Sequence, residues 1–244
     1  MRIGIVQASA KKGAISLNIK NHLNLIKSAL PSKPDLIVFP ELSIIGYEPE
    51  LAEKLACTID DERFNSFQVV ADTNKLTIGI GMPTQSKEGI NISMLLFRPH
   101  KARLIYSKQL LHADELPYFV SSNNQVFLII KEKKIAFGIC YETLQREHFI
   151  KAVENKADIY IASVAKPERG NKKAYVHFSS IAKEFKIPIL MSNCVGYCDN
   201  FMSNGKSAAW NKDGKLVAQL GKKHQGLLIY ETESEEATIL QIDN

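Results

Sequence analysis

Short apolar runs alternate along this chain with segments of helical periodicity, and this alternation restricts the possible fold more than any other feature. The runs at 2–7, 36–39 and 76–82 are rich in β-branched residues and bounded by turn residues, as buried strands are. Between them, apolar residues recur at helical spacing over 15–30 and 64–71. Strands that alternate with helices favour an α/β fold with parallel pairing.

The later part of the chain adds signals of antiparallel pairing. The run Asn211-Lys212-Asp213-Gly214 is typical of a tight turn between two strands. We therefore expect sheets covered by helices, in one domain over 1–244, because no linker, internal repeat or low-complexity tract divides the chain. Further strands are expected at 90–97, 102–106, 126–130, 135–139, 159–163, 187–192, 206–211, 215–219 and 225–230, and further helices at 143–155 and 172–186.

Composition and charge argue against several classes of protein. Hydrophobic residues make up 45% and charged residues 23% of the 244 residues, which suffices for a sizeable core. No run approaches about 18 consecutive apolar residues, and the amino terminus lacks the apolar segment of a secretory signal, so we expect a cytoplasmic protein without membrane contact. The net charge of +5 is spread over short pairs such as Lys133-Lys134, so we expect no nucleic-acid partner.

The four cysteines do not form the dense framework of a disulfide-rich protein, so reduced thiols are expected. Cys194 and Cys198 have a Cys-x-x-x-Cys spacing, but no second pair of ligands accompanies them. We therefore expect no metal and no cofactor.

Three short patches each place one reactive side chain at the end of an expected strand. Glu41 follows the strand at 36–39, Lys108 follows 102–106 and Cys140 follows 135–139. The carboxyl ends of strands are where α/β proteins assemble their sites. A thiol at a strand-to-helix turn also meets free backbone N–H groups and the positive end of a helix dipole, and both favour thiolate.

Each of these residues has a structural interpretation when it is taken alone. Cys140 could be a buried apolar residue, Glu41 could pin a loop or cap a helix, and Lys108 could be a surface lysine. Glu115, in the run His112-Ala113-Asp114-Glu115, could be an exposed loop acid. The joint occurrence of Glu, Lys and Cys in this order, with these flanking residues, is far more specific than any one of them.

The patches resemble the nitrilase superfamily of carbon-nitrogen hydrolases. That family has its glutamate in a Pro-Glu patch, its lysine in a Tyr-x-Lys patch and its cysteine before Tyr-Asp/Glu, and a second glutamate in a Glu-x-x-Tyr/Phe-Phe element. The corresponding runs here are Pro40-Glu41, Tyr106-Ser107-Lys108, Gly138-Ile139-Cys140-Tyr141-Glu142 and Glu115-Leu116-Pro117-Tyr118-Phe119. Asn193 to Gly196, Gly205 to Ser207 and Asp213-Gly214 also match, so the resemblance extends from Arg2 to Tyr230.

The resemblance implies an architecture and a reaction. The architecture is a four-layer α-β-β-α sandwich that forms a homodimer across one helical layer. In the implied reaction Cys140 attacks the carbonyl carbon of a small amide, while Glu41 accepts the thiol proton, passes a proton to the leaving amine and then activates the water that opens the thioester. Lys108 and the backbone N–H of Tyr141 would hold the oxyanion, and Glu115 would orient Lys108 or assist at the acyl carbon.

Substrate contacts are expected from Tyr47, Tyr141 and Lys166. Lys166 follows the strand at 159–163, where the family lines its pocket, and it could pair with a carboxylate of an ω-amide or N-carbamoyl acid or be a solvated loop lysine. Glu142 is not expected to be catalytic, because alternation along an extended stretch would point it away from its neighbour. Thr143 stands near the position of the family's aromatic-Pro pair and could cap the next helix.

Other functions remain open from the sequence. The same three residues serve members that cleave nitriles, although this chain has no long carboxyl-terminal extension of the kind many of those members carry. Acyl transfer to an amine would use the same thioester. A non-catalytic binding protein of α/β class is the third alternative, but no Gly-rich phosphate loop follows the first strand over 6–13.

Overall fold

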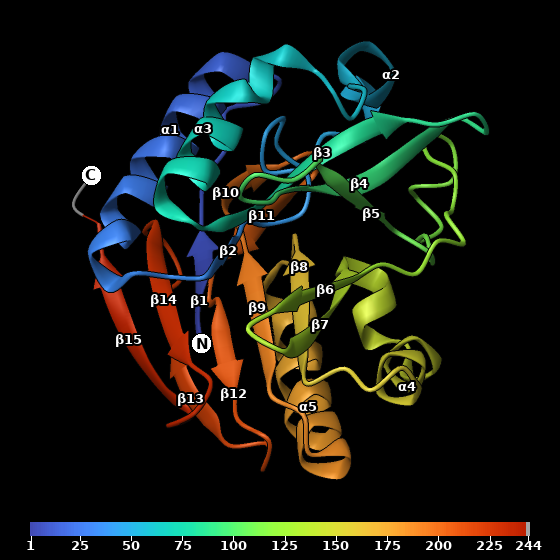
Figure 1. Ribbon diagram of the computed structural model, residues 1–244. Helices are drawn as coiled ribbons and strands as arrows, with labels where there is room; N and C mark the ends of the chain where they lie inside the picture. Colours follow the sequence, from blue (N-terminus) through green and yellow to red (C-terminus); the bar gives the residue numbers. More distant parts are fainter. Residues whose placement is uncertain (243–244) are drawn as a thin grey trace.

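Two β-sheets pack face to face at the centre of the molecule, and helices cover their outer faces (Figure 1). The computed structural model describes residues 1–242. The sheets contain seven and six strands, and a separate two-stranded hairpin joins them near the carboxyl ends of the parallel strands. This is the expected α-β-β-α sandwich.

The first sheet has the strand order β15-β14-β1-β2-β3-β4-β5. Its central strands β1, β2 and β3 are parallel, and the flanking pairs are antiparallel. Its strands are β1 (Arg2–Gln7), β2 (Leu36–Val38), β3 (Thr77–Gln85), β4 (Ile90–Phe97), β5 (Leu104–Ser107), β14 (Gly226–Glu231) and β15 (Glu236–Gln241).

The second sheet repeats this plan with the order β13-β12-β9-β8-β7-β6, in which β7, β8 and β9 are parallel. The small hairpin of β10 and β11 follows β9. The strands are β6 (Phe127–Ile130), β7 (Lys133–Ile139), β8 (Ile159–Val164), β9 (Ile189–Asn193), β10 (Val195–Cys198), β11 (Phe201–Asn204), β12 (Ala208–Trp210) and β13 (Leu216–Gln219).

Two helices cover each sheet. On the first sheet, His22 of α1 stacks on Phe39 and Phe67 of α3 packs on Phe97. On the second, Phe178 of α5 packs on Trp210 of β12. The helices are α1 (Ile15–Ala29), α2 (Ala52–Leu55), α3 (Asn65–Asn74), α4 (Arg146–Glu154) and α5 (Glu168–Phe185), with single 3₁₀ turns at Leu30–Ser32, Pro49–Leu51, Glu62–Phe64 and Cys140–Leu144.

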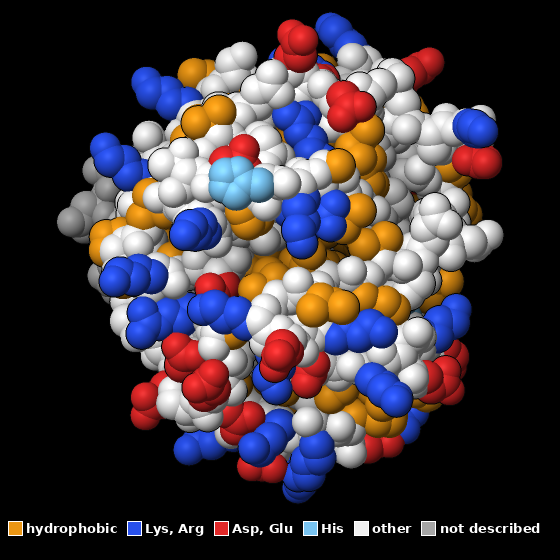
Figure 2. Space-filling view, viewed as in Figure 1, with side chains coloured by type: hydrophobic (Ala, Val, Ile, Leu, Met, Phe, Trp, Pro, Cys, Tyr) orange, Lys and Arg blue, Asp and Glu red, His pale blue; other side chains and the backbone are white. Residues whose placement is uncertain are grey.

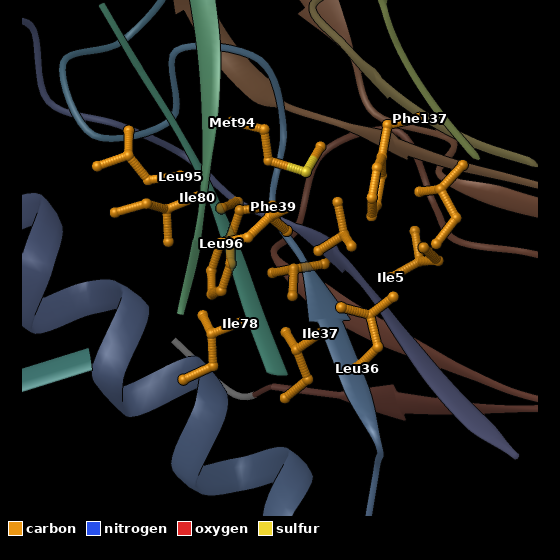
Figure 3. Close-up of a cluster of buried hydrophobic side chains, with 14 of the residues drawn as sticks. Ile5, Leu36, Ile37, Phe39, Ile78, Ile80, Met94, Leu95, Leu96 and Phe137 are labelled. Carbon is orange, nitrogen blue, oxygen red and sulfur yellow. The ribbon is translucent and has the colours of Figure 1, made fainter. Parts of the chain in front are cut away.

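Alternation along the strands divides the core into layers. In β7, Ile135, Phe137 and Ile139 belong to the cluster between the sheets, whereas Ala136 belongs to the cluster under α4 and α5. In Figure 3, Ile5 lies on the same side of the first sheet as Phe137 of the second, and Ile78 lies on the side of the helices. Every strand of the two parallel cores is therefore apolar on both faces, which explains the continuous apolar runs in the sequence.

The predicted elements agree with the structure to within a few residues, with two kinds of exception. The short helix α2, the hairpin of β10 and β11 and the edge strand β15 were not predicted. The expectation that Thr143 caps a helix is wrong, because α4 begins at Arg146 after Gln145, and the Thr143 hydroxyl donates instead to the Cys140 carbonyl at 2.6 Å. The turn over 211–214 does connect β12 to β13.

The surface carries charges of both signs. On the face shown in Figure 2, Lys and Arg side chains are interspersed with Asp and Glu. Within residues 1–242, no helix has the length and apolar character needed to cross a membrane.

Candidate active site

Glu41 lies in a tight turn directly after β2, and its neighbour Leu42 has a positive φ of 49°. The turn presses against Gly81 of β3, where an added Cβ would come within 2.4 Å of both Pro40 O and Leu42 N. Gly81 is bound to the same turn through its backbone, since its N–H donates to Ser43 Oγ and its carbonyl accepts from Ile44 N. Only a residue without a side chain allows this approach.

Lys108 follows β5 and connects two carboxylates. Its Nζ donates to Glu41 Oε1 at 2.8 Å and to Glu115 Oε1 at 2.6 Å, and all three side chains are almost completely buried. Glu115 also accepts from the Tyr47 hydroxyl at 2.9 Å and from His112 N at 2.8 Å. Glu115 is therefore a buried partner of Lys108, as the family resemblance implied, and not an exposed loop acid.

Glu41 keeps one carboxylate oxygen unused. Its Oε2 is buried and has no hydrogen-bond partner within residues 1–242. Burial raises the pKa of Glu41 to about 7, because the loss of hydration outweighs the opposing charge of Lys108 and Glu115 adds to the increase. A carboxylate with a free oxygen and a pKa near neutrality is suited to accept and return a proton.

Cys140 comes from the second sheet, at the end of β7, and begins a 3₁₀ turn with a positive φ of 47°. Such a backbone conformation is strained for a residue with a side chain, and strain of this kind concentrates at functional sites. Burial, together with the charge of Glu41, raises the pKa of the Cys140 thiol to about 12. Burial and Glu41 thus oppose the thiolate that the turn was expected to favour, and the thiol needs a base to ionise.

Glu142 is fully buried and ties the two strand ends together. Its Oε1 accepts from Tyr106 OH and from Ile139 N, and its Oε2 accepts from Gln109 N and Leu110 N, at 2.5 to 3.1 Å. It thereby links the segment after Lys108 to the turn at Cys140. The direction of its side chain does not follow the alternation of an extended strand, because this segment is a 3₁₀ turn.

A pocket of about 620 Å³ opens over the nucleophile. Cys140 and Glu115 line it, and so do Tyr47, Tyr141 and Lys166. All three side chains that were expected to contact substrate therefore face the same pocket. Glu41 and Lys108 are buried beyond Cys140 and Glu115, so the structure brings the seven predicted site residues together.

Other residues of the pocket were not found from the sequence as parts of a site. His112, His177, Asn200 and Phe201 also line it. Asn200 and Phe201 belong to the hairpin of β10 and β11, whose Asp-Asn pair was the only available turn signal. Burial and the nearby Lys166 lower the pKa of His177.

The site contains no group of side chains that would hold a metal. Among the described residues, no three His, Cys, Asp or Glu side chains are grouped as ligands. Cys194 and Cys198 are free thiols with their sulfur atoms 3.4 Å apart. The site contains a thiol, a carboxylate with a pKa near 7 and two ammonium groups. These are the groups that acyl transfer through a covalent intermediate requires.

Comparison with known proteins supports this chemistry. The sequence matches the carbon-nitrogen hydrolase family over residues 2–239. The chain belongs to the carbon-nitrogen hydrolase family. It is therefore a member of the nitrilase superfamily, and the order of its Glu, Lys and Cys patches is the order of that family.

Curated relatives of this carbon-nitrogen hydrolase differ in length. It is 25% identical to the glutamine-dependent NAD(+) synthetase of Synechocystis sp. over 97% of this chain, and 24% identical to that of Acinetobacter baylyi over 99%. The chain spans about half the length of these two relatives, 47% and 46%. A probable nitrilase of Schizosaccharomyces pombe is 22% identical, with 98% of this chain and 91% of that protein covered.

Solved structures support the fold. The NitN amidase from Nesterenkonia sp. AN1 superimposes with a TM-score of 0.86 over 95% of this chain and 92% of that one, at 20% identity. Variants of that amidase have been solved with butyramide bound and with the acetamide moiety of fluoroacetamide added covalently at the active-site cysteine. At this identity the similarity establishes the α-β-β-α sandwich alone.

Proposed function

We propose that the protein hydrolyses a small amide through a thioester on Cys140, releasing ammonia or an amine and a carboxylate. The observation that carries the proposal is the free, buried Oε2 of Glu41 beside a protonated thiol that lines the pocket. Glu41 binds Lys108 through its other oxygen, and the thiol contacts the Ala165 carbonyl and Lys166, both at 3.7 Å. Membership of the carbon-nitrogen hydrolase family supports the same chemistry.

In the first half-reaction the thiol proton moves from Sγ of Cys140 to Glu41 as sulfur attacks the amide carbon. The new C–S bond forms a tetrahedral intermediate, and Glu41 then passes the proton to the leaving nitrogen as the C–N bond breaks. In the second half, water gives a proton to Glu41 and attacks the thioester, and the C–S bond breaks with return of that proton to sulfur. A pKa of about 7 allows Glu41 to act in both directions.

Lys108 and Glu115 hold this carboxylate in place. Lys108 contacts both carboxylates, and Glu115 is itself fixed by the Tyr47 hydroxyl and by His112 N. We assign Lys108 and the backbone N–H of Tyr141 to the oxyanion, where a donor of this kind typically contributes about 3 kcal/mol. Tyr47, Tyr141 and Lys166, as lining residues, are assigned to contact with bound substrate.

The size of the pocket and the relatives suggest where to search for substrate. A volume of about 620 Å³ suits a small molecule and not a folded protein chain. Structural neighbours have been captured with butyramide, and curated relatives of about twice this length are named for glutamine. Short aliphatic amides and ω-amides are therefore the first compounds to test.

Ammonia release from matched pairs, such as butyramide against butyronitrile and glutamine against its nitrile analogue, tests the proposal. Turnover of amides that is lost in Cys140→Ala is the expected result, with iodoacetamide labelling Cys140 ahead of Cys57, Cys194 and Cys198. Turnover of nitriles alone would assign the protein to nitrile hydrolysis. Equal labelling of all four thiols together with no turnover of either class would favour a binding protein without catalysis.

We also propose that two copies associate across one helical layer, as the family resemblance implied. Size-exclusion chromatography with light scattering distinguishes a monomer of 27.3 kDa from a dimer. A strictly monomeric protein at micromolar concentration would contradict this part of the proposal.

A further inference from the structure

Lys166 places a second ammonium group against the nucleophile. Its Nζ lies 3.7 Å from Cys140 Sγ and 3.4 Å from the Cys140 carbonyl oxygen, and the residue is 96% buried. Within residues 1–242, no carboxylate lies within 4.0 Å of this ammonium group. A buried cation without a carboxylate partner is costly, so the position calls for a negative charge during function.

The backbone of Lys166 is held firmly where β8 leads into α5. Its N–H donates to Asn193 Oδ1 at 2.8 Å, and its carbonyl accepts from Asn204 N at 3.1 Å and from Ser203 Oγ at 3.2 Å. Asn193 is itself fixed by donation to Gly205 O at 2.7 Å. The ammonium is therefore presented by a rigid support and not by a mobile loop, which is the requirement for electrostatic preorganisation.

The distribution of charge shows what this cation is available for. The ammonium group of Lys108 forms ion pairs with Glu41 and Glu115 at 2.8 and 2.6 Å, so these two carboxylates already neutralise its charge. When Glu41 takes the thiol proton, the negative charge moves to sulfur. Lys166 is the ammonium that directly contacts that sulfur.

We propose that Lys166 is a second catalytic cation, which stabilises the Cys140 thiolate while Glu41 holds the thiol proton. The inference rests on the proposed thioester mechanism. Only one proton moves in this step, from Sγ to Glu41, and Lys166 keeps all of its own. After attack the negative charge passes to the carbonyl oxygen of the substrate, and Lys166 keeps its contact with the Cys140 carbonyl.

The same geometry argues against the earlier expectation that Lys166 pairs with a carboxylate of the substrate. Such a carboxylate would lie about 3 Å from Nζ. Because Nζ is only 3.7 Å from Sγ, a carboxylate paired with it would compete with the thiolate for the same ammonium group. Lys166 is thus too close to the nucleophile to bind a carboxylate at the end of the substrate distant from the amide.

Several other ionisable groups act on this pair and must be held constant in any test. Burial and Lys166 keep the pKa of His177 low, so its imidazole does not supply a competing charge near neutral pH. The groups that face Cys140 and Lys166 are Glu41, Lys108, Glu115, His177, Lys173, His112 and Asp114.

The test is the rate at which iodoacetamide alkylates Cys140 without substrate, followed by mass spectrometry of the Cys140 peptide between pH 6 and 10. Because an opposite charge at this distance shifts a pKa by one or more, Lys166→Met should slow alkylation at pH 8 by about tenfold or more and move the profile to higher pH. Lys166→Arg, which keeps the charge, should retain most of the rate. Lys172→Met, which removes an exposed charge of α5 outside this pocket, is the matched control and should alkylate at the wild-type rate.

Iodoacetate, run beside iodoacetamide, separates the two possible roles of Lys166. An unchanged rate with neutral iodoacetamide and a loss only with anionic iodoacetate would overturn the proposal in favour of carboxylate binding. Lys166→Gln provides a second neutral variant, and circular dichroism confirms that each variant is folded. Alkylation needs no turnover, so it tests Lys166 independently of the proposed function. If Lys166→Met slows alkylation but the wild type hydrolyses no amide, the proposed function is refuted and the role of Lys166 stands. If the wild type hydrolyses amides but Lys166→Met alkylates at the wild-type rate, the role of Lys166 is refuted and the proposed function stands.

Discussion

Substituting Gly81 by Ala provides a sharp test of how the fold positions the proposed base. A methyl group there would lie 2.4 Å from Pro40 O and Leu42 N and 2.9 Å from the Glu41 carbonyl carbon. Ordinary contacts begin near 3.4 Å, so the turn that carries Glu41 must move by about 1 Å. Backbone atoms on both sides prevent the relaxation that a flexible side chain would allow.

The expected effects differ between stability and activity. Overpacking of this kind typically lowers the free energy of unfolding by about 1–3 kcal/mol. A displacement of about 1 Å at a reacting group costs about 100-fold in rate, equivalent to roughly 2.7 kcal/mol in activation free energy. We therefore expect Gly81→Ala to be a folded protein whose kcat for amide hydrolysis falls about 100-fold.

Gly79→Ala is the matched control, two residues earlier on the same face of β3. Its added methyl group meets the side chains of Met94 and Leu96, with the nearest atom at 2.9 Å. Methionine adapts to such a change, so kcat should stay within a factor of about three. Urea denaturation and steady-state kinetics of both variants provide the measurements. Wild-type kcat in Gly81→Ala, or an equal loss in both variants, would refute the argument that Gly81 positions Glu41.

Two further predictions concern the carboxylates. The pKa of Glu41 is raised to about 7, and the base must be ionised to accept the thiol proton. We therefore expect kcat/KM for a neutral amide to rise with pH through a midpoint near 7. A flat profile between about pH 5 and 9 would argue against Glu41 as the base. Glu142→Gln replaces one acceptor oxygen by an amide nitrogen that cannot accept, so two of the bonds from Tyr106, Ile139, Gln109 and Leu110 are lost. The free energy of unfolding should fall by about 3 kcal/mol or more, measured by urea denaturation, and a change below about 1 kcal/mol would show that the network adds little.

Strands with two buried faces were predictable because their residues form continuous apolar runs. The boundaries of β1 and β4 agree with the sequence expectation at both ends. The hairpin of β10 and β11 was missed because its exposed Tyr197 and Met202 pair across strands on the solvent side, without an apolar face that repeats. β15 was missed for a related reason, since an edge strand carries a weak hydrophobic pattern.

The catalytic candidates were predictable because each follows a strand and matches a family patch. The protonation state of Cys140 could not be predicted. A sequence pattern reveals the turn but not the desolvation that raises the pKa of the thiol to about 12. Lys166 illustrates the same limit. Its place after β8 was visible, whereas its contact with sulfur depends on Asn193 and Ser203, which lie 27 and 37 residues further along the chain.

The proposed base and nucleophile come from different sheets, Glu41 after β2 and Cys140 after β7. Within the described chain, no ladder of strand hydrogen bonds joins the two sheets. Apolar side chains hold them together, with the buried Glu142 carboxylate and single hydroxyl contacts such as Ser163 Oγ to Phe39 O at 2.9 Å. The distance over which the proton travels is therefore set by the thickness of the layer between the sheets. The catalytic rate should therefore depend on that thickness. Heat, pressure or a cavity in this layer should change the rate of turnover before the strands within each sheet separate.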